Sequence, residues 1–331
     1  MKIAYFLSWG AGPSPYNGVR VQAETWAEEL RRKGHDVSLV GAWDRGNWED
    51  FDVLHVFMAN PGTLDLIRTF WRRNSNIVFS PIIDTEKSVF AYRLACLAGI
   101  SRINIGTYQY FTRLARPYIK KWIVRSDFEA SYVHGSYGVP YEQIKKIPLS
   151  FRTSTPVQLS VKQDYCLHVS KITDSRKNVM RLMEASVKYG FRLVLAGGIS
   201  GEESFRPMKE FINAHSNIEY LGRVSDDRLI KLYTQAKVFA LPSTCEGVGL
   251  VALEAAACGC NIVITNIGGP KEYYGDMAFK VDPYSVDAIG NAVKAAMLDQ
   301  SKQPALMKYI NEQYNLSICV DKLIDLYNEC K

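Results

Sequence analysis

Two glutamates and the glycines between them carry the clearest chemistry in this chain. Glu246 and Glu254 lie eight positions apart; Glu246 opens a loop that contains Gly247 and Gly249, and Glu254 lies in an apolar, alanine-rich stretch that predicts a helix. A glycine loop that leads into a helix start presents unpaired backbone N–H groups and the positive end of the helix dipole, which suit a phosphate. Carboxylates on either side of such an anion site suit neutral hydroxyls. The segment therefore predicts a site for a nucleotide sugar.

Further sequence motifs lie on both sides of this loop. Upstream are His168-Val169-Ser170-Lys171 and Lys177-Asn178, and downstream is the run from Gly259 to Glu272. In this order, these segments resemble family 4 retaining glycosyltransferases, whose signature has seven residues between two glutamates. The resemblance covers roughly residues 165–290 well and residues 1–40 moderately.

The resemblance implies a role for each residue. Glu254 would bind the ribose hydroxyls, and Glu246 would bind hydroxyls of the donor sugar. Lys171 and Lys177 would bind the diphosphate and stabilise the charge that develops on it as the glycosidic bond breaks. The family usually has arginine at the position of Lys171, so this lysine supplies charge without a two-pronged grip. Backbone amides of the loop and the first helical turn would bind the pyrophosphate: those of Gly247, Val248, Gly249, Leu250 and Val251.

The first loop of the chain allows two interpretations. Gly10-Ala11-Gly12 begins like a dinucleotide-binding G-x-G-x-x-G fingerprint, but Pro15 occupies the third glycine position. No acidic residue ends the second predicted strand near Val40, which also argues against a nicotinamide oxidoreductase. The family resemblance instead implies that Gly18 approaches the diphosphate from the first domain.

The acceptor side departs from the family. Many members carry a histidine after the strand that we predict at 76–80, but Ile82 and Ile83 occupy that place here. Asp84 is the polar candidate for a catalytic role, and it is equally suited to cap a helix. His55 could face a cleft, although a lone histidine is more often structural.

Length and periodicity predict two α/β domains. The 331 residues suit two domains, and a composition of 47% hydrophobic and 22% charged residues excludes disorder. Strands alternating with helices predict two doubly wound, Rossmann-like parallel sheets, the GT-B arrangement, with ligands in an interdomain cleft. We expect an acceptor-binding domain at 1–150, a donor-binding domain at 151–310 after a polar linker at 151–164, and a helix at 311–331 that by resemblance crosses back to the first domain. The expected strands are 2–8, 36–40, 52–57, 76–80, 165–169, 191–196, 218–221, 237–241 and 261–265, and the expected helices are 22–33, 178–189, one after Pro207, 226–235 and 250–258.

Charge is concentrated in one segment. The net charge is +6, and the eight cations between Lys87 and Ser126 have no Asp or Glu among them. Either these elements are core with a solvated basic face, or they contact anionic lipid head groups or a diphosphate-linked acceptor. Nucleic acid is disfavoured because no recognition motif accompanies the charge. The cations are residues 87, 93, 102, 113, 116, 120, 121 and 125, interleaved with Tyr108, Tyr110, Phe111, Tyr118 and Trp122.

Other composition signals concern location and metals. Seven cysteines, mostly in apolar runs, indicate reduced thiols in a cytoplasmic protein, and the strand-like start at Met1 does not resemble a signal peptide. No apolar stretch approaches membrane-spanning length, so a membrane location would be peripheral, on the inner face. Cys258 and Cys260 form a C-x-C without a second pair, and no Asp-x-Asp motif accompanies the donor loop, so we expect no metal or other cofactor.

Together these signals predict a retaining, metal-independent glycosyltransferase with a nucleotide diphosphate sugar donor and a glycan or lipid-linked acceptor. The expected catalytic residues are Glu246, Lys171, Lys177 and Asp84. No carboxylate pair of the hydrolase kind is evident. A non-catalytic sugar-nucleotide-binding subunit and a sugar-nucleotide epimerase of the same fold are the alternatives.

Overall fold

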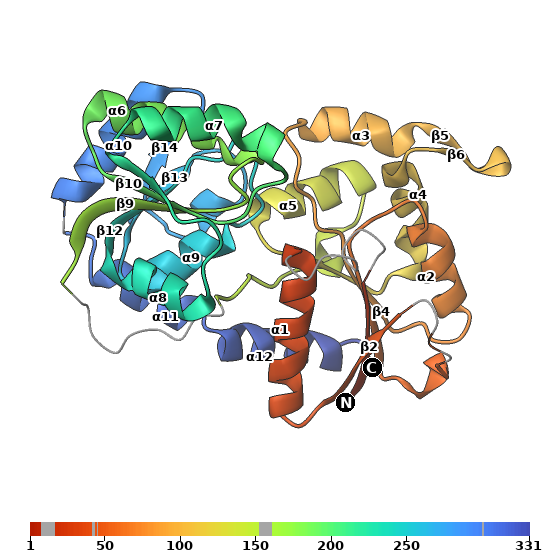
Figure 1. Cartoon of the computed structure of the whole chain (residues 1–331). Coiled ribbons are helices and arrows are strands. Elements are labelled where there is room, and N and C mark those ends of the chain that lie inside the picture. Colours follow the sequence, from red (N-terminus) through yellow and green to blue (C-terminus); the bar gives the residue numbers. More distant parts are fainter. Residues whose placement is uncertain (8–16, 42–43, 45, 152–160, 300) are drawn as a thin grey trace. The chain divides into compact units, whose positions relative to one another are not determined.

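The computed structural model describes residues 1–7, 17–41, 44, 46–151, 161–299 and 301–331. The chain forms two compact units (Figure 1). The first contains Met1–Leu149 and Leu316–Lys331, and the second contains Ser150–Asn315. Each unit has a six-stranded parallel sheet, which confirms the predicted fold class of two Rossmann-like α/β domains. The Gly10-Ala11-Gly12 sequence and most of the predicted linker lie outside the described residues.

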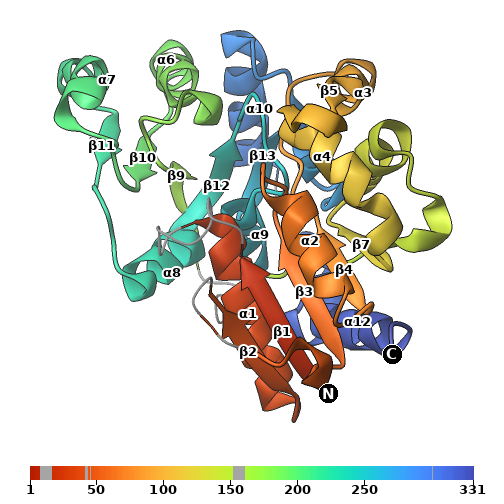
Figure 2. The same ribbon diagram turned by 90° about the vertical axis from the view of Figure 1, so that its right-hand side faces the viewer.

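The sheet of the first unit has the strand order β2-β1-β3-β4-β7-β8, which Figure 2 shows from β2 to β7. The order reverses between β1 and β3, and right-handed crossovers therefore place α1 and α2 on opposite faces. A two-stranded antiparallel hairpin, β5–β6, stands apart from this sheet. The strands are β1 Lys2–Leu7, β2 Asp36–Val40, β3 Val53–Phe57, β4 Ile77–Ser80, β5 Gly99–Ile100, β6 Ile105–Gly106, β7 Lys121–Val124 and β8 Ile144–Lys146.

Helix α1 shows how sequence sets the elements of this unit. Asn17 caps its start by accepting a hydrogen bond from Val19 N at 2.9 Å, so the helix begins before the predicted residue 22. Trp26 and Leu30, one turn apart, pack against the sheet, and Gly34 follows the helix with a φ of +86°. The helices of the unit are α1 Gly18–Arg32, α2 Thr63–Trp71, α3 Val89–Leu97, α4 Tyr108–Ala115, α5 Asp127–Tyr132 and α12 Leu316–Asn328.

The second unit has the strand order β11-β10-β9-β12-β13-β14. Its strands are nearly continuous apolar runs, because helices cover both faces of the sheet. The strands are β9 Gln163–Val169, β10 Leu193–Ala196, β11 Ile218–Tyr220, β12 Ala236–Leu241, β13 Asn261–Thr265 and β14 Phe279–Val281. The helices are α6 Val179–Tyr189, α7 Glu202–Ala214, α8 Asp226–Gln235, α9 Leu250–Ala257, α10 Val286–Leu298 and α11 Ala305–Gln313.

Two predicted helices have the wrong bounds. The helix expected at 311–331 begins only at Leu316, because α11 occupies the chain up to Gln313. We expected a helix to begin after Pro207, but Pro207 lies inside α7, which begins at Glu202. Pro207 is exposed, so water can satisfy the helix carbonyl that the missing N–H leaves free. Phe205, which is buried, and Met208 hold this helix against the core on both sides of the proline.

The last helix, α12, completes the core of the first unit. Tyr327 is fully buried, and its hydroxyl lies 2.7 Å from His55 Nδ1 and donates to Tyr5 Oη at 2.9 Å. At the surface, Lys33 Nζ pairs with Asp321 Oδ1 at 2.7 Å. Polar contacts thus join α12 to strands β1 and β3 of the same unit. In the described part of the chain, no helix is both long and apolar enough to cross a membrane.

Candidate functional site

The strand order of the second unit locates its binding edge. The chain runs outward from β9 to β10 and β11, then returns to β12, which lies on the other side of β9. Ligands of doubly wound sheets bind at such a switch point, beside the carboxyl ends of the two central strands. The loop after β9 carries Lys171 and Lys177, and the loop after β12 carries Glu246 and Gly249. The predicted donor residues thus lie at the edge where parallel-sheet topology favours a ligand.

Lys177 and Glu246 meet at this edge. Lys177 Nζ lies 2.5 Å from Glu246 Oε2, and the two side chains are only 20% and 14% exposed. Ser243 Oγ also donates to Glu246 Oε2, at 3.4 Å. A cation and a carboxylate from two different loops are therefore held together, partly shielded from water.

Asn178 ties three loops of the site together. It has a left-handed backbone with a φ of +58°, which asparagine tolerates better than most residues. Its buried side-chain amide donates to Pro242 O at 3.0 Å and to Pro283 O at 2.6 Å. Thr244 N adds a bond to Arg176 O at 2.8 Å. These contacts fix the position of Lys177 relative to the loop after β12.

Glycines occupy two tightly packed positions with left-handed backbone near the start of α9. Gly249 has a φ of +76°, and a Cβ there would lie 2.9 Å from Leu241 Cδ2. Gly268, in the loop after β13, has a φ of +81°, and its Cβ would lie 2.9 Å from Glu246 O. No side-chain hydrogen bond caps the start of α9, where Leu250 and Val251 are the first two residues. The loop geometry therefore leaves a helix N-terminus beside Glu246 and Lys177.

Glu254 is buried in α9 among apolar neighbours. It is 1% exposed, and Tyr233 in α8 donates from its hydroxyl to Glu254 Oε2 at 3.2 Å. Burial raises the pKa of Tyr233 well above its usual value, and the nearby Glu254 carboxylate raises it further. The tyrosine therefore stays protonated and can serve as a donor to the carboxylate. The sequence analysis missed Tyr233, which lies 21 positions away on a different helix.

His168 supports the same edge from inside β9. It is fully buried; its Nδ1 lies 2.8 Å from Ala240 O, and its Nε2 lies 2.7 Å from Ser170 Oγ. Burial lowers its pKa to about 4, against a smaller opposing effect of the bond to Ala240. A neutral imidazole thus bridges β9 and β12 at the point where both strands end.

Two predicted donor residues are placed without contacts that define a role. Lys171 is exposed directly after the Ser170 that follows β9. Gly18 is the first residue of α1 in the first unit, and a Cβ there would meet nothing within 4 Å. Packing within the described residues does not require glycine at position 18.

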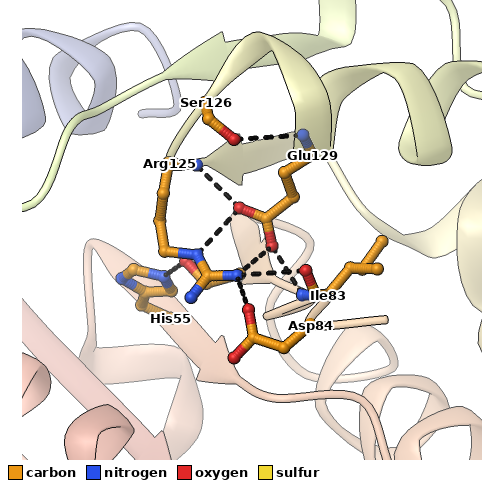
Figure 3. Close-up of polar contacts among 7 residues, drawn as sticks. His55, Ile83, Asp84, Arg125, Ser126 and Glu129 are labelled. Atoms are coloured by element: carbon orange, nitrogen blue, oxygen red, sulfur yellow. Dashed lines mark hydrogen bonds and ion pairs between the residues drawn. The ribbon is translucent and has the colours of Figure 1, made fainter. Parts of the chain in front are cut away.

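Asp84 takes part in an ion cluster rather than a helix cap (Figure 3). Its Oδ1 accepts from Arg125 Nη2 at 2.8 Å, and the N-terminus of the next helix, α3, is capped by Ser88 instead. Arg125, which follows β7, also donates from Nε to Glu129 Oε2 at 3.0 Å. Glu129 Oε1 accepts from Ile83 N at 2.6 Å. The capping alternative for Asp84 is therefore wrong, because an arginine 41 positions away engages its carboxylate.

Two carboxylates in this cluster stabilise the positive charge of the buried Arg125. Arg125 is 7% exposed and Glu129 is 1% exposed. Burial alone disfavours the charged guanidinium, but the carboxylates of Asp84 and Glu129 outweigh it and hold the pKa of Arg125 above its ordinary value. The Asp84 side chain keeps 35% of its surface exposed, so one end of the cluster faces solvent.

His55 is structural within the first unit. It is fully buried in β3, with Ser80 Oγ 2.8 Å from its Nε2 and the Tyr327 hydroxyl at its Nδ1. Burial lowers its pKa well below the usual value. Both ring nitrogens are therefore occupied by protein partners, and the ring is neutral.

The described ranges of both units contain no cluster of metal-binding side chains. No group of three or more His, Cys, Asp or Glu side chains there is arranged to hold a metal ion. All seven cysteines are buried, and none of them forms a disulfide bond within the described residues.

Comparison with known proteins agrees with this geometry. Residues 152–313 match the family Glycosyl transferases group 1. The chain is 29% identical to the O-antigen chain mannosyltransferase B of Escherichia coli, over 61% of this chain and 58% of that protein. It is 28% identical to an uncharacterized glycosyltransferase of Methanocaldococcus jannaschii, over 99% of this chain and 98% of that protein. The chain thus spans little more than half of the E. coli relative.

Solved structures share the whole fold. The sucrose-phosphate synthase of Thermosynechococcus elongatus superposes with a TM-score of 0.76 at 16% identity, covering 99% of both chains. HepE of Anabaena, solved in complex with UDP, superposes with a TM-score of 0.75 at 15% identity, covering 99% of this chain and 100% of that chain. Residues 152–313 thus resemble the glycosyltransferase group 1 domain, and the chain has the two-domain GT-B fold of these structures.

Proposed function

We propose that the chain is a retaining glycosyltransferase that moves a sugar from a nucleotide diphosphate sugar to an acceptor hydroxyl. The observation that carries this proposal is the convergence, at the β9/β12 switch point, of the Lys177–Glu246 pair, the uncapped start of α9 and the buried Glu254. A cation and a helix N-terminus suit a diphosphate, and two shielded carboxylates suit sugar and ribose hydroxyls.

The ion pair suggests how the donor is accepted. Lys177 and Glu246 satisfy each other in this structure. A donor would offer phosphate oxygens to the ammonium and hydroxyl groups to the carboxylate, so each partner exchanges one polar contact for another. Donor binding would therefore leave neither of these two partly buried charges without a partner.

The chemical step requires positioning and charge stabilisation more than acid–base groups. The bond between the anomeric carbon and the diphosphate oxygen breaks, and the acceptor oxygen bonds to the anomeric carbon on the same face. The acceptor proton passes to an oxygen of the departing diphosphate. Lys177, Lys171 and the α9 amides stabilise the charge that accumulates on this leaving group. With these positive groups present, we propose that the reaction needs no metal.

The substrate class is proposed from the named relatives. Besides the E. coli enzyme, they include a GDP-mannose-dependent phosphatidylinositol monomannoside mannosyltransferase of Mycobacterium tuberculosis and a D-inositol 3-phosphate glycosyltransferase. We propose a hexose donor and a glycan or lipid-linked acceptor in polysaccharide or glycolipid synthesis. We place the reaction in the cytoplasm, a location that suits seven buried cysteines outside any disulfide bond.

The test combines binding and turnover. A thermal-shift panel of GDP, UDP, ADP and their hexose conjugates identifies the donor, because a ligand at a hundred times its Kd stabilises by ~2.7 kcal/mol. Transfer from the stabilising donor to glycolipid or oligosaccharide acceptors, followed with and without a chelator, then tests activity and metal independence. No stabilisation by any nucleotide would overturn the donor site. Inversion of the anomeric configuration would overturn retention, and loss of activity with chelator that is restored by magnesium would overturn the metal-free mechanism.

A non-catalytic nucleotide-sugar-binding subunit is the second candidate. The observation that favours it is the engagement of Asp84, the polar residue on the acceptor side, by Arg125. Binding of a nucleotide sugar without transfer, and without slow hydrolysis of the donor, would favour this subunit over the enzyme.

A further inference from the structure

Helix α3 carries apolar side chains on two opposite faces. Tyr92 and Cys96 are buried against the core. Phe90, Leu94 and Leu97, at helical spacing, point outward and are 71%, 53% and 50% exposed. A helix that is apolar on all sides is normally covered on all sides. The outer face of α3 therefore has the composition of a contact surface.

The hairpin after α3 continues this surface. Ile100, Ile103 and Ile105 are 57%, 60% and 62% exposed. Figure 1 shows α3 leading directly into β5 and β6 at one margin of the first unit. We call the six residues Phe90, Leu94, Leu97, Ile100, Ile103 and Ile105 the apolar edge.

The hairpin packs closely against Tyr110 and is bonded to the end of α3. A Cβ at Gly99 would lie 2.3 Å from the ring of Tyr110, and a Cβ at Gly106 would lie 2.9 Å from the same ring. Thr107 Oγ1 donates to Ala95 O at 2.5 Å, which ties the end of the hairpin to α3. Close packing on Tyr110 thus holds the three isoleucines outward.

Cations surround the apolar edge. Lys87, Arg93 and Arg102 are exposed, and none of them forms an ion pair with the residues that the structure describes. Other cations of the 87–126 segment are engaged within the protein: Arg116 donates to Gly138 O at 2.7 Å, and Lys120 donates to Cys330 O at 2.7 Å. Lys87, Arg93 and Arg102 therefore remain available, beside the apolar edge, to contact an anionic surface.

The structure also corrects which aromatic residues are available. Phe111 and Trp122 belong to the buried core of the first unit, and Tyr118 packs against Trp71. The buried rings of Phe111 and Trp122 are not available for the contact surface that the sequence suggested. Phe90 and the aliphatic residues of the apolar edge take that place.

We propose that the apolar edge docks the protein on a bilayer that contains anionic lipids. The six apolar side chains would enter the boundary between head groups and acyl chains, while Lys87, Arg93 and Arg102 contact lipid phosphates. This inference goes beyond the proposed function, since it does not depend on the donor site.

Charge favours a bilayer over a second copy of the chain. A two-fold contact through the apolar edge would place the basic residues of one copy near the same residues of the other. Like charges would then face each other without an acidic residue of the 87–126 segment to separate them. An anionic membrane satisfies both the apolar and the basic part of the surface.

Vesicle sedimentation tests the proposal with the full chain and no donor present. We expect binding to phosphatidylcholine vesicles that contain phosphatidylglycerol, weaker binding at raised salt, and little binding to pure phosphatidylcholine. Arg93→Gln/Arg102→Gln should lower the partition coefficient by about 25-fold, about fivefold for each arginine. Ile100→Ser/Ile103→Ser should also release the protein. Matched controls are Lys209→Gln/Lys294→Gln for charge and Leu298→Ser for an apolar residue that is 83% exposed in the second unit; these should bind like the parent.

Ile103→Trp reports insertion directly. Its added fluorescence should be quenched by brominated acyl chains in anionic vesicles, and circular dichroism checks that each variant is folded. Binding that ignores lipid charge, or an Arg93→Gln/Arg102→Gln variant that binds like the parent, overturns the proposal. A concentration-dependent dimer that Ile100→Ser/Ile103→Ser dissociates, without vesicle binding by the parent, overturns it in favour of self-association.

Discussion

Glu254 keeps a carboxylate in a helix that is otherwise apolar. Because it is 1% exposed and accepts a bond from the Tyr233 hydroxyl, its geometry is set before any ligand binds. We expect Glu254→Gln to weaken binding of the preferred nucleotide by roughly tenfold to a hundredfold, since a charged hydrogen bond contributes about 1.5–3 kcal/mol. Isothermal titration calorimetry measures the change.

A control separates this loss from misfolding. Glu184 is an exposed glutamate on α6 of the same unit, and Glu184→Gln should leave nucleotide affinity unchanged. Unchanged affinity in Glu254→Gln, with the urea midpoint of the parent, would remove Glu254 from the donor site.

Lys177 should matter more for turnover than for donor binding. Its ammonium is held beside Glu246, and the leaving diphosphate gains charge as the bond breaks. We expect Lys177→Ala to lower kcat by at least about tenfold, with a smaller change in KM, and Lys171→Ala to act in the same direction. Steady-state kinetics with the identified donor provides the measurement, with exposed Lys209→Ala as the control. A rise in KM with an unchanged kcat would contradict this expectation and would mean that Lys177 only positions the donor.

Sequence predicted single residues unevenly, for physical reasons. The apolar stretch around Glu254 predicted a helix, and α9 confirms it. The partner of Asp84 could not be predicted, because Arg125 follows a different strand, β7, and meets Asp84 only once β4 and β7 pair. Tyr233 was missed for the same reason, since local patterns do not show contacts between helices.

At the scale of elements, two loops must fit closely around Glu246. Gly268→Ala would strain a backbone with a φ of +81° and push a Cβ against Glu246 O. We expect a loss of about 1–2 kcal/mol in stability and, in addition, weaker nucleotide binding, because Glu246 must move. Chemical denaturation and calorimetry measure the two effects.

Gly190→Ala is the matched control for this substitution. Gly190 has a φ of +64° at the end of α6, but a Cβ there meets nothing within 4 Å. Gly190→Ala should lower the free energy of unfolding by a similar amount and leave nucleotide affinity unchanged. Equal nucleotide affinity in both variants would contradict a close fit between the two loops.

Periodicity located most elements but not their ends. Strands β2 and β13 and helix α8 have the predicted bounds. Ser225 caps the start of α8, and strand β12 begins directly after its last residue. Helix α7 extends through Pro207, since tertiary packing of Phe205 and exposure of the proline override the local signal. The switch points follow from the strand order, which depends on how distant strands pair and so cannot be obtained from local patterns.

At the scale of the whole molecule, α12 shows how a late segment completes an early core. The sequence predicted a helix there, and the structure places Leu316–Lys331 in the first unit. The contact depends on Tyr327, His55 and Tyr5, which are as far as 322 positions apart in the chain. Only the folded structure shows that His55 has a structural partner in the last helix.

The buried imidazoles of the two units give the molecule a predictable response to acid. Burial holds the pKa of His168 at about 4 and that of His55 well below its usual value. The unfolded chain takes up a proton on each histidine below about pH 6.5, whereas the folded units resist it. The stability that depends on neutral histidines is therefore fully present above that pH and is lost as the pH falls toward the folded pKa. For His168 alone, the loss between about pH 6.5 and about pH 4 is on the order of 3 kcal/mol.

Urea unfolding across this range, with a fluorescence probe in each unit, tests the response. We expect the free energy of unfolding to fall by about 1.4 kcal/mol per pH unit for each buried histidine, in addition to the effect of the carboxylates. His168→Gln should remove one such increment from the second unit and leave the slope of the first unit unchanged, and His55→Gln should do the reverse. Each variant is compared with the parent by its slope and not by its stability at neutral pH, because the lost hydrogen bonds to Ala240 O or Tyr327 lower stability at every pH. Equal slopes of the free energy of unfolding against pH in parent and variants would contradict this expectation. They would mean that the folded units take up protons on His168 and His55 without unfolding, and that polar contacts in both cores tolerate the charge.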